Sequence, residues 1–282
     1  MNKPTLLLAA AMTCGGTALA QDNTSNLLQE GSKNEAVVEQ LGADNQSLLI
    51  QDADDNDATV NQTGTGNSAE VQTAGGDNVV ALTQLGDGNI AVSIITEANV
   101  MANLTQEGSS NVARQELDAP DSEASIFVDG SDNTTVQMVS GVGNNVAQIG
   151  LAGSGSTATQ DIDGENSRSY ITSFGDGALV VTEQVGTSNN VSILQEMGDN
   201  NSAVVAQAGD NNFAGGEGDP QLTQTGSDNS LVLSQDGDMN ASSITQTGDE
   251  NDALNAQGGN GNQSVITQLG SHNAARVVQR AQ

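Results

Sequence analysis

Apolar and polar residues alternate along most of the chain, in short runs separated by glycine-containing segments. The run Asn34-Glu35-Ala36-Val37-Val38-Glu39-Gln40 is representative, and residues 56–62, 189–195 and 240–246 have the same order. Alternation with a period of two predicts β-strands. One face carries asparagine, a small residue, an aliphatic residue and glutamine, and we expect it to point inward. The other face is mixed, as in residues 46–50, so we expect it to meet solvent or a partner.

The runs recur with a period of eleven residues, most clearly from Gln224 to Gln279. Glutamine occupies every eleventh position there, and in the first five units glycine follows it by two residues and asparagine by five. Upstream, the period starts at Gln29 and holds to Val128, with other residues at some glutamine positions. A fixed period of this length indicates a repeat architecture, and we count about 22 whole units.

Three insertions interrupt the period. One residue is inserted between Val128 and Ser140, a second before Gln207, and six around Gly215 to Gln221. The units from about residue 117 to 173 are the most degenerate. No change of composition within the array indicates a second domain.

Helical repeats are excluded by the unit itself. A period of eleven is found in right-handed helical coils, but glycine and asparagine, which recur in nearly every unit, are poor in helix interiors. One strand and one corner make a unit, so two units make a flattened coil that returns the chain above its start. We therefore predict an all-β fold, a two-sheet parallel β-solenoid of about 11 rungs, with Gln224 over Gln246 and Gln235 over Gln257.

Inward glutamine and asparagine cost free energy unless they are hydrogen-bonded. Stacked in register, each amide can donate to one neighbour and accept from the other, which also fixes the register of the strands. The predicted ladder residues are Gln29, Gln40, Gln51, Gln62, Gln84, Gln106, Gln184, Gln195, Gln224, Gln235, Gln246, Gln257, Gln268 and Gln279, with Asn34, Asn45, Asn67, Asn89, Asn189, Asn229, Asn240, Asn251, Asn262 and Asn273.

The first 20 residues have the pattern of a cleaved secretory signal peptide. Lys3 precedes an apolar run from Leu6 to Met12, and Ala18-Leu19-Ala20 resembles a cleavage site. The only cysteine, Cys14, lies in this segment, so the mature chain is expected to form no disulfide. We expect residues 21–28 to be a short N-terminal segment and 29–282 a single solenoid. No later run is long and apolar enough for a membrane helix.

Composition and charge limit the classes of function that the chain can have. The formal net charge is −30 and there is no polybasic patch, which argues against nucleic-acid binding. Acidity with few aromatic residues is also typical of disordered chains, but periodic apolar positions oppose disorder. Acids gather in the expected corners, where they form a solvated face or bridge divalent cations such as Ca²⁺; no other cofactor is expected. These acids are Asp44, Asp55, Asp77, Asp87, Asp199, Asp210, Asp228, Asp238 and Asp249.

An enzyme is not expected. His272 is the only histidine and falls in a corner, and no set of a nucleophile and a base recurs. Carboxylates on a β-helix serve some glycan lyases and hydrolases. Those folds carry long loops and clefts lined by aromatic or basic side chains, and this chain has few residues of either kind.

The repeated unit resembles the curlin repeat of curli subunits, the secreted functional amyloid of bacterial biofilms. It stands clearly at residues 62–69 and 268–275. The resemblance implies a solenoid that polymerises end to end into extracellular cell-surface fibres for adhesion, with itself, other curli-type subunits and an outer-membrane export pore as partners. This chain has more repeats, fewer aromatic residues and more acid than the typical subunit.

Two alternatives to a main fibre subunit remain open. Arg276 and Arg280 fall in the last seven residues, and curli nucleator subunits also end in basic, less regular repeats, so the chain is a candidate nucleator or anchor. A monomeric calcium-dependent adhesin is the other alternative. Polymerisation of the purified protein distinguishes a fibre subunit from the monomeric adhesin.

Overall fold

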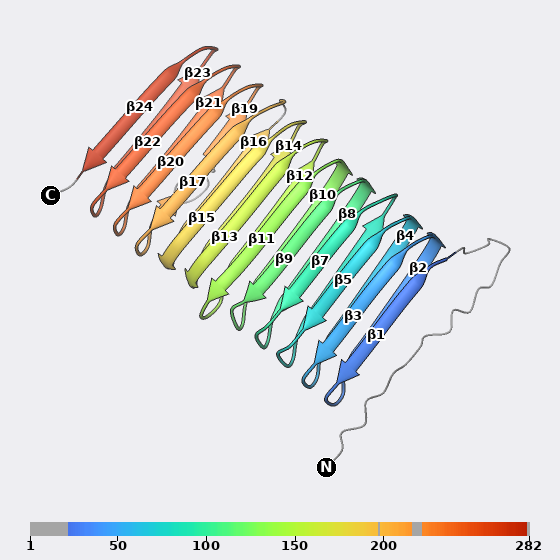
Figure 1. The fold of residues 1–282 in the computed structure, drawn as a ribbon. Helices are drawn as coiled ribbons and strands as arrows, with labels where there is room; N and C mark the ends of the chain where they lie inside the picture. Colours follow the sequence, from blue (N-terminus) through green and yellow to red (C-terminus); the bar gives the residue numbers. More distant parts are fainter. Residues whose placement is uncertain (1–21, 197, 216–221, 281–282) are drawn as a thin grey trace.

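The computed structural model describes residues 22–196, 198–215 and 222–280. Within these ranges the chain forms strands and corners and no helix. The strands stack side by side into a rod, with β1 and β2 at one end and β23 and β24 at the other (Figure 1). The predicted all-β, two-sheet parallel β-solenoid is confirmed.

The first sheet contains twelve parallel strands. In spatial order they are β1 (Thr24–Glu30), β3 (Gln46–Asp52), β5 (Ser68–Thr73), β7 (Ile90–Ile95), β9 (Val112–Asp118), β11 (Thr134–Gly141), β13 (Thr157–Glu165), β15 (Leu179–Thr187), β17 (Ser202–Ala208), β20 (Ser230–Asp236), β22 (Asp252–Gly258) and β24 (Ala274–Arg280).

The second sheet also contains twelve strands, but at eleven positions. They are β2 (Glu35–Ala43), β4 (Asp57–Thr65), β6 (Val79–Leu85), β8 (Met101–Ser109), β10 (Glu123–Ser131), β12 (Val146–Ala152), β14 (Arg168–Phe174), β16 (Asn190–Glu196), β18 (Phe213–Ala214), β19 (Leu222–Thr225), β21 (Ala241–Thr247) and β23 (Gln263–Leu269). Both β18 and β19 lie between β16 and β21, so they are two halves of one strand, separated by residues within the expected insertion.

Each strand pairs with the strand two units away, as the period predicts. Gln224 lies opposite Gln246 and Gln235 opposite Gln257, in parallel register. The expected pairing is therefore confirmed, and consecutive strands alternate between the sheets.

The start of the solenoid differs from the boundary drawn at residue 29. Strand β1 begins at Thr24 and ends at Glu30, so Gln29 is near the end of the first strand. Units counted from one glutamine to the next leave out the strand that precedes the first glutamine. Most of the expected segment 21–28 thus belongs to the first rung.

The degenerate middle is as regular in backbone as the rest, but its phase differs from the predicted one. Val139 lies opposite Leu117 and Ile162 at the glutamine position, while Ser140 points to the other face. The first inserted residue therefore falls after β11 and not before it. A corner accommodates an extra residue, whereas an extra residue inside the strand would move its apolar set to the wrong face.

The inward face is buried along the rod. In β4, Ala58, Val60 and Gln62 are at most 1% exposed, and the alternate positions are half-buried or exposed. The predicted order of asparagine, small, aliphatic and glutamine on the inside is confirmed. Only at the ends do inward side chains such as Val38 and Val277 remain partly buried.

Candidate functional site

Inward glutamines form chains of hydrogen bonds along the rod. In the second sheet, Nε2 of Gln40 donates to Oε1 of Gln62 (2.8 Å), Gln62 to Gln84 (2.8 Å) and Gln84 to Gln106 (3.0 Å). Each Nε2 also donates to a backbone carbonyl of the opposite sheet, for example Gln40 to Thr24 O at 3.0 Å. Both amide hydrogens are therefore used, and the two sheets are linked across the core.

The C-terminal half contains one such ladder in each sheet. In the first sheet Gln184 donates to Gln207, and the series continues through Gln235, Gln257 and Gln279 at 2.7–3.0 Å. In the second sheet the ladder comprises Gln195, Gln224, Gln246 and Gln268 at 2.8–2.9 Å. In the N-terminal half of the first sheet, Gln29 donates to Gln51 at 2.7 Å.

Between these ladders, other residues occupy the glutamine position. In the first sheet they are Thr73 and the apolar residues Ile95, Leu117, Val139 and Ile162. A separate ladder runs two residues earlier, from Gln115 through Gln137 to Gln160, at 2.8 Å per step. Sequence reasoning missed these three buried glutamines because it followed only the main phase; their own spacing of 22 and 23 residues was the available signal.

In every ladder the glutamine donates toward the C-terminal end of the rod. A ladder that begins inside the rod therefore starts with a glutamine that accepts from no other glutamine. The Oε1 atoms of Gln115 and Gln184 are buried without a partner, because the preceding residues at those positions, Ser93 and Ile162, do not donate to them. Gln195 avoids this, because the Ser173 hydroxyl donates to its Oε1 at 2.9 Å.

Asparagines link neighbouring rungs at the corners, both as donors and as acceptors. Oδ1 of Asn45 accepts the backbone amide of Asn67 at 3.1 Å, and Nδ2 of Asn45 donates to the carbonyl of Gly64 at 2.9 Å. All ten predicted asparagines lie in such corners, directly before a strand. The same corner position, before the strands of either sheet, also contains Asn23, Asn56, Asn78, Asn111, Asn133, Asn145, Asn201 and Asn212.

Corner glycines are required by backbone angle and by contact with the next rung. Gly86 has φ of +115°, and a Cβ built on it would lie 1.9 Å from the carbonyl oxygen of Gly108. Gly66, at a second corner position, has φ of +70° but open space around its Cβ direction. Rungs therefore approach more closely at the first position than any side chain permits.

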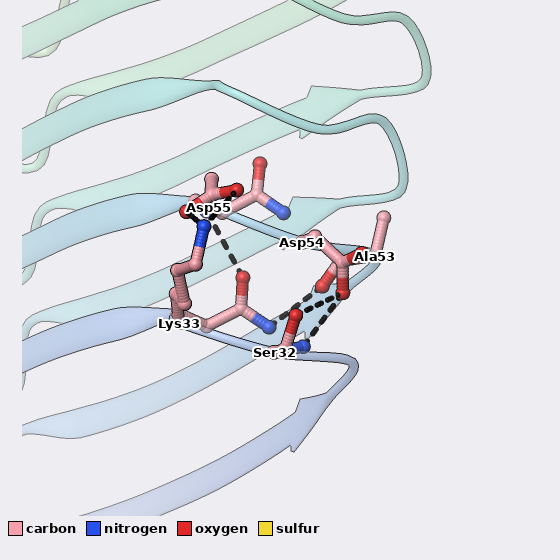
Figure 2. A network of polar contacts seen from close by, with 7 residues as sticks. Ser32, Lys33, Ala53, Asp54 and Asp55 are labelled. Atoms are coloured by element: carbon pink, nitrogen blue, oxygen red, sulfur yellow. Dashed lines mark hydrogen bonds and ion pairs between the residues drawn. The ribbon is translucent and has the colours of Figure 1, made fainter.

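Corner acids have two structural roles. One group accepts a backbone amide from the preceding rung: Asp54 takes the amide and the hydroxyl of Ser32 at 2.7 and 2.9 Å (Figure 2). Asp87 and Asp249 accept from Thr65 and Ser227 in the same way. The second group has positive φ, a left-handed conformation that aspartate tolerates. It comprises Asp22, Asp44, Asp55, Asp77, Asp121, Asp132 and Asp228.

Two carboxyl groups have shifted pKa values. Backbone and side-chain hydrogen bonds from Thr187 lower the pKa of Asp210. Partial burial, together with the nearby carboxylates of Glu183 and Asp163, raises the pKa of Asp161 on the outer face of the first sheet.

Basic side chains pair with acids of the neighbouring rung or of the same strand. Lys33 contacts Asp55 at 3.2 Å (Figure 2), and Nε2 of the corner residue His272 lies 2.9 Å from Glu250. Arg114 pairs with Glu116 on the outer face of β9. Among the described residues, no three histidine, cysteine or acidic side chains are placed to hold a metal ion together. No helix in the described ranges is long and apolar enough to cross a membrane.

The two ends leave these networks incomplete. In the part of the chain that the structure describes, β1 and β2 are paired on one side only, as are β23 and β24 (Figure 1). No described residue donates to Oε1 of Gln29 or Gln40, and at the other end Gln268 and Gln279 each donate once, to a backbone carbonyl.

The curlin associated repeat matches this chain over residues 20–52, 53–86 and 226–254. All three stretches lie in parts of the array that keep the period of eleven, and the apolar middle lies outside them. No curated protein matches the chain.

Proposed function

Because this chain is a curlin-repeat protein, we propose that it is a secreted structural subunit of curli-type amyloid fibres that grow by adding strands rung on rung. The observation that carries the proposal is the pair of open ends, where strand edges, amide ladders and core all stop without a cover among the described residues. The curlin repeat and the β-solenoid fold are structural in kind, so the proposal gives the chain no catalytic role.

Growth follows from what an open end presents. An unpaired strand edge offers backbone donors and acceptors at the spacing of the next strand. A second chain that docks there completes backbone and amide bonds together. It also covers Leu27, Val38 and Val277, which are only partly buried, and each square ångström of apolar surface removed from water contributes about 25 cal/mol.

The proposal includes a location and partners. The chain passes the periplasm after cleavage of its signal peptide, leaves through a curli-type outer-membrane pore, and assembles with itself and other curli-type subunits at the cell surface. There the fibre serves adhesion and the biofilm matrix. The outward-facing acids keep the unassembled chain soluble, since it carries a net charge of −30.

Polymerisation of the purified mature chain, residues 21–282, tests this function. We expect fibres with a meridional spacing of ~4.8 Å in diffraction and a lag that disappears when preformed fibres are added. A chain that remains monomeric with and without calcium would contradict the fibre subunit. Calcium-dependent surface binding by that monomer would favour an adhesin instead.

A second candidate function is supported by the charge of the last strand. Arg276 and Arg280 lie exposed on β24, and neither makes an ion pair with a described residue. A basic terminal rung suits a nucleator or anchor that docks on an acidic surface. Replacing both arginines by glutamine should then release fibres from cells into the medium, while purified protein still polymerises. Cell-bound fibre at the unmodified level would exclude the anchor.

A further inference from the structure

The two ends of the rod are complementary rather than alike. At the β23–β24 end, Gln268 and Gln279 each have an amide hydrogen to spare, and Oδ1 of Asn262 and Asn273 accepts nothing from a described residue. At the other end, no described residue donates to Oε1 of Gln29 or Gln40. Glutamine donors at one end face glutamine acceptors at the other, so head-to-tail contact satisfies both ends. Contact between like ends opposes acceptor to acceptor at two β1–β2 ends and donor to donor at two β23–β24 ends.

The number of strand positions decides how the copies are rotated. The described chain has twelve positions in the first sheet and eleven in the second, an odd total of 23. Because consecutive units alternate between sheets, each unit is related to the next by a half-turn about the rod axis and an advance of half a rung. The position after β24 therefore belongs to the second sheet, above β23.

Resting on the fibre function proposed above, we propose that successive copies stack head to tail with a half-turn about the fibre axis. Strand β1 of the added copy pairs with β23 of the earlier one, and β2 pairs with β24. The first sheet of one copy thus continues into the second sheet of its neighbour, and every second copy has the same orientation.

The inward residues match across this joint. With Gln268 opposite Gln29, Ile266 meets Leu27 and Ser264 meets Ser25. With Gln279 opposite Gln40, Val277 meets Val38 and Ala275 meets Ala36. Each pair repeats the combinations seen within the rod, such as Val38 opposite Val60 and Gln40 opposite Gln62.

The outward charges match as well. In this register Arg276 lies opposite Val37 and diagonal to Glu35 and Glu39, and Arg280 is diagonal to Glu39. All four charged side chains are exposed, and none makes an ion pair with a described residue. Opposite charges at directly opposed or diagonal positions of neighbouring strands attract.

Stacking without the half-turn fits less well. It would set β1 on β24, with Gln29 opposite Gln279, and β2 would then lie two rungs from β23. One strand position of the second sheet would remain empty at every joint. An empty position leaves the edge of β23 unpaired inside the fibre, where a lost backbone hydrogen bond is costly.

Cysteine cross-linking distinguishes the two arrangements, since residues 21–282 contain no cysteine. Val278 and Glu39 are outward positions placed directly opposite by the half-turn, and Val278 and Leu28 are opposed without it. Directly opposed residues of paired strands lie within the Cα separation of about 4.4–6.8 Å that a disulfide requires. We would build Val278→Cys with Glu39→Cys as the test chain, and Val278→Cys with Leu28→Cys as its matched control.

After mild oxidation of preformed fibres, the Val278/Glu39 variant should give a ladder of covalent multimers on a denaturing non-reducing gel, and the control should not. A ladder from the control alone overturns the half-turn while leaving the fibre function intact. Dimers from the Val278→Cys single variant would indicate tail-to-tail contact and overturn the polarity. Absence of fibres from the unmodified mature chain would overturn the fibre function itself, and this stacking with it.

A charge reversal tests the joint without cysteine. Glu39→Lys should slow seeded elongation at low salt by about two- to fivefold, the effect expected of exposed cross-strand charge pairs. Adding Arg276→Glu and Arg280→Glu should restore the rate, and high salt should remove the difference. Glu30→Lys is the matched control, because Glu30 lies opposite Arg280 only without the half-turn. Slowing by the control alone would contradict the proposal.

Discussion

Buried amides are the residue-scale feature that distinguishes this solenoid. Gln235 accepts from Gln207 at 2.7 Å, donates to Gln257 at 2.8 Å and donates to Phe213 O at 3.1 Å. Removing a side chain with this many buried hydrogen bonds costs much free energy, because its partners lose their hydrogen bonds and remain buried away from water.

We therefore expect Gln235→Ala to destabilise the rod by about 1–3 kcal/mol for each orphaned group. Chemical denaturation of the mature chain measures the change, and the assembly lag should lengthen. Gln46→Ala is the matched control, because Gln46 faces outward on β3 and is exposed. Equal effects of the two substitutions would contradict the assignment of Gln235 to the structural ladder.

The contribution of Asp161 to the stability of the fold should depend on pH. Its carboxyl lies directly opposite Glu183 on the outer face, and its pKa is raised by burial and by Glu183 and Asp163. A raised pKa in the folded state means that the protonated form favours folding, so this group contributes stability at low pH that is lost as pH rises through its folded pKa.

Asp161→Asn should consequently raise the melting temperature at pH 7. A cross-strand charge pair contributes on the order of 0.2–1 kcal/mol, and the gain in stability should be a fraction of that. The gain should vanish at a pH where Asp161 is protonated. Thermal melts between about pH 3 and 7 measure the change in melting temperature, because this range includes the ordinary pKa of a carboxyl group and extends above it. Asp163→Asn serves for comparison; an equal gain for Asp161→Asn at the lowest and highest pH would contradict the cause.

At the scale of the element, the corner is what makes one strand lie over another. Gly86 and Gly66 both have positive φ, but only Gly86 lies close to the next rung. The two glycines therefore separate the cost of the backbone angle from the cost of contact between rungs.

We expect Gly66→Ala to cost about 1–2 kcal/mol, the usual penalty of a left-handed backbone for a residue with a Cβ. Gly86→Ala should cost clearly more, because its Cβ would collide with the carbonyl oxygen of Gly108 and force two rungs apart. Urea denaturation of the two variants gives the comparison. Similar losses would mean that the rungs yield at this corner.

Most of the element pattern was predictable, because period two gives the strand and period eleven gives the pairing. Prediction failed where a local choice was free. Ser140 and Val139 both fit the count, and only burial of the apolar side chain selects Val139. The Gln115 ladder was missed because inward positions two residues apart are equivalent in alternation, and the role of Asp54 depends on a backbone amide one rung away.

At the scale of the whole molecule, charge opposes association. The chain has 36 acidic and 6 basic residues. Acids also lie one rung apart, as where Asp238 accepts the backbone amide of Asp210 at 3.0 Å. Repulsion between exposed charges extends over about 30 Å at 0.01 M salt but about 10 Å at 0.1 M.

Fibre growth should therefore be slow at low ionic strength and neutral pH, and faster after addition of salt or a moderate decrease in pH. Seeded elongation followed by light scattering at a fixed seed concentration measures the dependence. Sodium chloride and calcium chloride compared at equal ionic strength separate general screening from specific cation binding. Fastest growth in low salt at neutral pH would show that charge is not the barrier.

The register also sets how far along the chain each contact reaches. Paired residues are 22 or 23 positions apart, except across the insertion, where Gln195 and Gln224 are 29 apart. A separation of 22 in 282 residues is a relative contact order of about 0.08, which is typical of fast-folding helical bundles and not of β-sandwiches. After the first two rungs form, each further unit closes a loop of the same short length on an existing template. Such a chain can fold progressively from whichever end first leaves the export pore proposed above, before the rest of the sequence has emerged.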